Sequence, residues 1–146
     1  MKKRYNFKRS ADNLDESIAL DIEALQLNPV GHPDCTRSVH SLVQSMRTRC
    51  DLTGSVEDLE DAICFGKEAV QYCSAEYRDR LLVLENVALC FCLRYELTKN
   101  KGDLEESIRL NREAILLCSS GHKSRDYALH ELAIGIWHDI VVVVQD

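Results

Sequence analysis

Apolar residues along the chain fall at helical spacing, and short polar segments separate one such stretch from the next. In the first stretch, Leu14, Ile18 and Leu25 recur on one face of a helix. Proline and glycine in the segment Asn28-Pro29-Val30-Gly31 then oppose its continuation. The pattern predicts a helix that ends at about this segment.

The first stretch has two later counterparts, and a second helix is predicted after each of the three. These second helices cover residues 36–52, 80–97 and 126–143. The copy at 80–97 is apolar on most sides, so we expect neighbours to cover it on more than one face. Residues 140–144 alternate weakly like a strand, but the repeat described next predicts a helix there too. The linkers are short and polar, as expected between antiparallel helices. The coarse prediction is six helices in three hairpins.

The helical pattern repeats every 45 residues without a gap. The matched sets are Arg4, Arg49 and Arg94; Leu14, Leu59 and Leu104; Ile18, Ile63 and Ile108; Ala24, Ala69 and Ala114; and Leu42, Val87 and Leu132. A period of about 20 to 50 residues indicates a stacked array of supersecondary units. We therefore expect an all-α solenoid of about three hairpins in one domain. Its units fall at approximately 13–57, 58–102 and 103–146, with residues 1–12 as the tail of a preceding incomplete unit.

Each unit opens with a polar residue and carries an acid three positions later. The pairs are Asn13 with Glu16, Asp58 with Asp61, and Asp103 with Glu106. The first side chain can accept from free N–H groups of an opening helical turn, and the acid complements the positive helix end. We therefore expect a helix to begin at each of these three positions.

Charge and hydropathy narrow the classes of partner. The formal net charge of −6 disfavours nucleic acid, which normally binds a basic face. The longest dense apolar run, residues 87–93, is much shorter than the roughly 20 residues of a membrane span. Residues 5–12 are too polar for a signal peptide. We expect a cytoplasmic protein with no nucleic-acid or membrane partner.

The seven cysteines do not suggest a disulfide framework, because their number is odd and no CxxC pair occurs. We interpret them as reduced and mostly buried thiols, with Cys64, Cys90 and Cys92 packed inside helices. His32, Cys35 and His40 have the tightest metal-like spacing, but they lack a fourth ligand and a paired CxxC or HxxxH element. No metal or other cofactor is expected.

Read from the second helix of one unit into the first helix of the next, the chain resembles a tetratricopeptide repeat. Asn86-Val87-Ala88 and Glu131-Leu132-Ala133 resemble the Asn-Leu-Gly or Asn-Leu-Ala of that family's first helix, and Phe91 falls at its later aromatic position. Glu106-Ser107-Ile108, followed by Ala114, resembles its Glu-Ala-Ile and downstream alanine, and Pro29 lies where the family closes a repeat. The unit exceeds the usual length of about 34 residues.

The longer unit resembles the tetratricopeptide variants of large fungal proteins, some of which carry a nucleotide-binding switch module or a caspase-like CHAT domain. No Walker-type glycine loop and no Cys-His catalytic signature occurs in this sequence, so neither module is implied here. The resemblance implies a right-handed solenoid and a noncatalytic scaffold for protein–protein interaction, not an enzyme. The alternative is a structural spacer or an oligomerising fragment of a larger array, with no groove ligand of its own.

Arrays of this family bind partners on the concave surface, which the first helix of each tetratricopeptide hairpin lines. In this reading the first helices are those at residues 36–52, 80–97 and 126–143. By register, the partner-binding residues expected there are Arg37, His40, Gln44, Arg47, Glu85, Asn86, Leu89, Tyr127 and His130. Arg37 and Arg47 favour an extended acidic or acidic-hydrophobic peptide. The carboxylate clamp of chaperone-binding members is largely absent, because His40, Tyr127 and Glu131 occupy its basic positions. His40 and His130 lie two units apart and are not expected to share a ligand.

The C-terminal helix is expected to lack cover on its outer side. The unsatisfied apolar residues would be Leu129, Ile136, Ile140 and Val143, or a subset of them, and Ile134 and Trp137 would face a missing neighbour. Terminal units of repeat arrays usually carry a polar capping face, and residues 140–144 are apolar. We therefore expect either self-association through this helix or a truncated piece of a longer array whose next helix is missing.

Overall fold

The computed structural model describes residues 2–29, 32, 34–72, 77–118 and 123–145, and every helix predicted from the sequence is present in it. The described residues form six helices and no strand: α1 (Lys2–Leu27), α2 (Cys35–Thr53), α3 (Val56–Tyr72), α4 (Tyr77–Thr98), α5 (Lys101–Leu117) and α6 (Lys123–Gln145). The all-α prediction is confirmed, including the helical assignment of residues 140–144.

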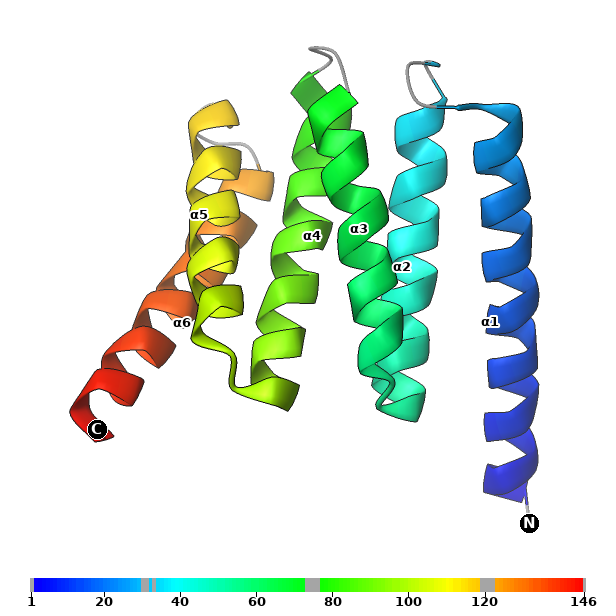
Figure 1. Ribbon diagram of the computed structural model, residues 1–146, viewed down its shortest axis with the longest axis horizontal. Coiled ribbons are helices and arrows are strands. Elements are labelled where there is room, and N and C mark those ends of the chain that lie inside the picture. The colour runs from blue at the N-terminus through cyan, green and yellow to red at the C-terminus, as the bar shows by residue number, and fades with distance from the viewer. Residues whose placement is uncertain (1, 30–31, 33, 73–76, 119–122, 146) are drawn as a thin grey trace.

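The helices form a row of antiparallel neighbours with α1 and α6 at its two ends (Figure 1). Each helix packs against the next one along the chain, and α2, α4 and α6 also pack against one another in turn. Among the described residues, α1, α3 and α5 make no such contacts with each other. The array therefore has an inner layer of α2, α4 and α6 and an outer layer of α1, α3 and α5.

Helix α4 is the centre of the array, because it contacts α2, α3, α5 and α6. Its buried residues include Leu84, Val87 and Phe91, in agreement with a helix that is apolar on most sides. A methyl group on Gly66 of α3 would overlap Cγ2 of Val87, so the glycine permits a close approach of the two helices. The expected cover on several faces of this helix is confirmed.

The predicted helix starts are wrong in detail. Helix α1 runs unbroken through Asn13, and Asp58 and Asp103 lie at the third positions of α3 and α5. The N-cap of α5 is Asn100, whose side chain accepts from the Gly102 N–H. Asp58 and Asp103 are buried instead against Arg49 and Arg94, so their carboxylates bind side chains across the turn.

The sequence of α1 explains why no turn interrupts it. The turn before α3 contains Thr53 and Gly54, and Gly54 has a φ of +72°. One repeat earlier the chain has Lys8 and Arg9, and Asn13 stands where the later units have aspartate. The equivalent residue of the turn before α5, Lys99, also has a positive φ, so the turn does not require glycine. What the first unit lacks is the carboxylate that binds the preceding arginine in both later turns.

Five of the described cysteines are buried, as expected: Cys35, Cys50, Cys90, Cys92 and Cys118. No disulfide joins any of the described cysteines. Cys64 is exposed, so its expected place in the core is wrong. The equivalent residues one repeat away, Ala19 and Arg109, are exposed as well, because this position faces outward from the outer layer. Cys73 lies outside the described residues.

The expected lack of cover on α6 is confirmed for Leu129, Ile136, Ile140 and Trp137, which are exposed. Ile134 is half-buried, and the side chain of Val143 lies outside the described residues.

No helix in the described ranges is long and apolar enough to cross a membrane.

Candidate interaction surface

A cavity of about 220 Å³ opens on the inner layer of the array, between α2, α4 and α6. Its lining residues are Arg47 from α2, Glu85, Asn86 and Leu89 from α4, and Tyr127 from α6. All five belong to the set expected from the repeat register. Three helices from different units thus converge on one small cavity with charged, amide, apolar and aromatic walls.

Asn86 connects α4 to α2 beside this cavity. Its Nδ2 donates to Nδ1 of His40 at 2.9 Å and to the Leu82 carbonyl at 2.7 Å. Burial lowers the pKa of His40, and the nearby charge of Arg47 lowers it further. A neutral imidazole accepts the amide proton, so His40 acts as a fixed acceptor in the wall of the inner layer.

The two open sides of the cavity differ in charge. The arginines that form ion pairs with other described residues are Arg49, Arg80, Arg94 and Arg109, and Arg47 is not among them. Burial raises the pKa of the Tyr127 phenol, and the carboxylate of Glu131 adds to this effect. The α2 side therefore offers a cation, and the α6 side offers a neutral phenol beside an acid.

Four of the nine expected residues do not line the cavity, and His40, which binds Asn86 beside it, is one of them. Arg37, Gln44 and His130 are exposed on α2 and α6, and none of them lines it. Arg37, His40, Gln44 and Arg47 fall at helical spacing on α2, so Arg37 and Gln44 share a helical face with the cavity residue Arg47. Glu131 was not among the expected residues, although its charge acts on Tyr127.

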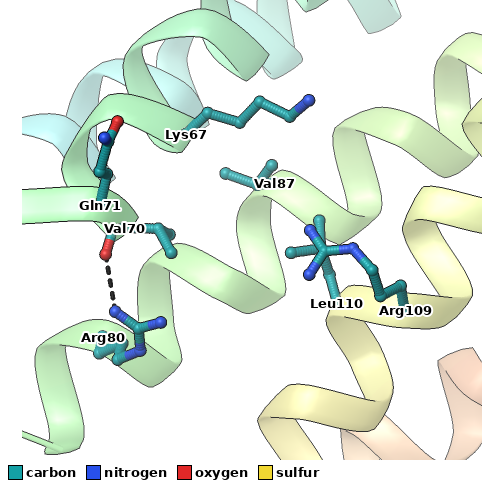
Figure 2. A pocket seen from close by; sticks show the side chains of 7 residues that line it. All are labelled: Lys67, Val70, Gln71, Arg80, Val87, Arg109 and Leu110. Carbon is teal, nitrogen blue, oxygen red and sulfur yellow. Dashed lines mark hydrogen bonds between the residues drawn. The ribbon is translucent and has the colours of Figure 1, made fainter.

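A second cavity of about 350 Å³ lies between α3, α4 and α5 and was not expected from the sequence (Figure 2). The side chains around it include three cations, and Figure 2 shows the hydrogen bond from Arg80 to the Val70 carbonyl; the lining residues are Lys67, Val70, Gln71, Arg80, Val87, Arg109 and Leu110. Arg80 donates at 2.6 Å to that carbonyl and at 2.7 Å to Glu113.

The arginines of the second cavity serve the packing of the array. Arg109 binds Glu106 and Glu113, so Glu113 is shared by two guanidinium groups. Arg125 lies 45 residues after Arg80 and donates in the same way to the Ile115 carbonyl at 3.0 Å. The repetition identifies Arg80 as the cap of the end of α3. The equal spacing of Arg80 and Arg125 was the signal for this contact in the sequence.

Within the described part of the chain, no three His, Cys, Asp or Glu side chains are placed to hold one metal ion. His32, Cys35 and His40, which have the tightest metal-like spacing in the sequence, do not form such a group. Comparisons of the chain with family models, with curated proteins and with solved structures found no match.

Proposed function

We propose that the chain is a right-handed, tetratricopeptide-like solenoid that binds an extended peptide of a partner protein on its inner layer, without catalysis. In this assignment α2, α4 and α6 are the first helices of successive hairpins. The contacts between alternate helices support it, because helices pack with one another along the inner layer and not along the outer one. Such spacing curves an array toward its inner layer, which becomes the concave surface.

The observation that carries the proposal is the cavity of Arg47, Glu85, Asn86, Leu89 and Tyr127. Its residues come from three hairpins and meet on the layer where the register placed a binding surface. At about 220 Å³ it is smaller than the roughly 300 to 1,000 Å³ of pockets for drug-sized ligands. A cavity of this size suits one side chain of a longer ligand.

The walls define the chemistry of that ligand. Arg47 offers a guanidinium without a carboxylate partner among the described residues, which suits an acidic side chain or a chain-terminal carboxylate. Leu89 and the ring of Tyr127 offer apolar surface for the neighbouring side chain. Arg37 lies nearer the start of α2 and adds a second cation on the helical face of Arg47. These features favour an acidic-hydrophobic peptide, with its acidic residues toward α2.

Buried cysteines without a disulfide suit a reducing compartment, and we place the proposed interaction in the cytoplasm.

Selection from a random peptide library tests the proposal. The immobilised chain should enrich peptides that combine acidic and large apolar residues. R47E should weaken the binding of a selected peptide by at least about fivefold, which corresponds to about 1 kcal/mol, and the effect should shrink at high salt. Y127A should weaken binding because it removes an apolar wall.

The matched control is R112E, which makes the same charge change at an exposed arginine of α5 in the outer layer. It should leave the affinity within about twofold of the parent. A library that yields no enriched peptide, or equal losses for R47E and R112E, would contradict a binding surface on the inner layer.

A further inference from the structure

The exposed apolar residues of α6 occupy repeat positions that are buried elsewhere in the array. Leu129 is 43% exposed, whereas Leu84, one repeat earlier, is fully buried at 0%. Ile140 is 56% exposed, and its equivalent Tyr95 is 3% exposed. The same holds one unit further back, where Val39 and Cys50 are buried. These positions on α6 therefore form an uncovered copy of a surface that the array buries twice.

The missing cover is identified by the neighbours of α2 and α4. Helix α3 packs against α2, and α5 packs against α4, in each case as the helix that follows. Helix α6 packs only against α5 and α4 within the described residues. A helix with the face of α3 or α5 would therefore fit the open side of α6.

Helix α1 has such a face, and that face is open. By the 45-residue register, Leu14, Leu20 and Ala24 of α1 correspond to residues of α3 and α5. Leu20 is 59% exposed, whereas its equivalent Leu110 is 3% exposed and its equivalent Phe65 is half-buried. Leu14 and Ala24 are half-buried, whereas all four of their equivalents are buried: Leu59, Leu104, Ala69 and Ala114. The difference arises because α3 and α5 each pack between two inner helices and α1 packs against α2 alone.

We propose that a second copy of this chain covers α6 with its own α1, so that copies join head to tail. The contact of α6 with α1 of the next copy is equivalent to the contact of α2 with α3 and to that of α4 with α5 within one molecule. Because the two surfaces differ, each copy keeps one open end, and the assembly grows with concentration instead of closing as a symmetric dimer. This contact lies apart from the cavity of the inner layer.

The polar residues at the edge of this contact are compatible with it. Arg94 and Asp103 pair within the chain, and the corresponding positions across the contact are Asp139 of α6 and Asn13 of the neighbouring α1. Both are exposed in the single chain. The amide of Asn13 can donate to the carboxylate of Asp139, which reverses the direction of the internal contact and keeps a donor opposite an acceptor.

Sedimentation velocity on the chain and two variants tests the proposal. The parent should show a weight-average sedimentation coefficient that rises from about 1 to about 100 μM. L20E damages only the α1 face and I140E only the α6 face, and each should raise the apparent dissociation constant at least about tenfold. Both side chains are more than half exposed, so the variants should keep the parent's helical circular dichroism.

Mixing the two variants gives the decisive result. L20E keeps a sound α6 face and I140E keeps a sound α1 face, so the mixture should form a 1:1 complex that grows no further. L116E, at a leucine of α5 that is 86% exposed, should associate like the parent. N13D should weaken association, and N13D with D139R should restore it by rebuilding the internal Arg–Asp pair between copies.

A parent that stays monomeric at about 100 μM would overturn the proposal and leave α6 for a different occupant. Association that survives L20E and is lost in I140E would instead show a symmetric contact between two α6 helices. That result would overturn the head-to-tail arrangement.

Discussion

Arg94 and Asp103 form a two-pronged ion pair across the turn between α4 and α5, with Nε–Oδ2 at 2.8 Å and Nη2–Oδ1 at 2.6 Å. Arg49 and Asp58 make the same pair across the turn between α2 and α3. Hydrogen bonding to Asp103 raises the pKa of Arg94, so this guanidinium stays charged at every accessible pH. The same side-chain contact thus links two helices across each of two successive interhelical turns.

The first prediction concerns this ion pair. D103N removes the negative charge and leaves a mostly buried guanidinium without its counter-ion, so we expect a loss of about 2 to 3 kcal/mol in the free energy of unfolding. The value falls below that of a fully buried pair because one edge of Arg94 reaches solvent. Urea denaturation measures it. E106Q, which breaks the exposed pair with Arg109, should cost less than about 1 kcal/mol. Equal losses in the two variants would refute a structural role for the turn pair.

The second prediction concerns pH and His40. Burial and then Arg47 lower the pKa of His40 in the folded chain, so below about pH 6.5 the unfolded chain binds more protons at this residue. The free energy of unfolding should therefore fall as the pH drops from about 6.5 toward the folded-state pKa, with no contribution above that range. H40Q should lose less stability than the parent between about pH 7.5 and 5.5 in urea titrations. The same loss in both proteins would contradict a buried, neutral imidazole.

The third prediction concerns thiol reactivity. Burial raises the pKa of Cys90 to about 12 and that of Cys92 to about 11, so both remain protonated thiols near neutral pH. Cys64 is exposed on α3. A short treatment of the native chain with N-ethylmaleimide, followed by peptide mass spectrometry, should show modification at Cys64 well before Cys90 or Cys92. C64S should lose that early label, and C90S should retain it. Labelling of Cys90 as fast as Cys64 would place α4 at the surface.

The repeat allowed much of the fold to be predicted, because the residue pattern of each helix occurs two or three times at an offset of 45 residues. The same register placed Arg47, Asn86 and Tyr127 on one layer before their contacts were known. It did not reveal how α1 begins. The capping rule considers only a polar residue and the apolar run that follows it. It therefore does not include Arg49, which lies nine residues before Asp58 and binds it across the turn.

Other features depend on how the side chains pack in three dimensions. Cys64 was expected in the core because cysteine is commonly buried, but its position on α3 faces outward. Arg37 and Gln44 share the helical face of Arg47, yet the cavity reaches only the part of α2 that lies opposite Tyr127. The contact of Arg80 with a backbone carbonyl of the neighbouring helix left a trace in the sequence only as the 45-residue spacing of Arg80 and Arg125, which does not name the acceptor.

Binding of a peptide to the inner layer can be tested by a two-dimensional NMR titration of the chain with a selected acidic-hydrophobic peptide. We expect backbone amide shifts clustered around Arg47 of α2, Leu89 of α4 and Tyr127 of α6, with the exposed face of α5 around Arg112 unchanged. The same titration of R47E should move these signals only at higher peptide concentration. Shifts confined to α1, α3 and α5 in the parent would contradict a binding surface on the inner layer.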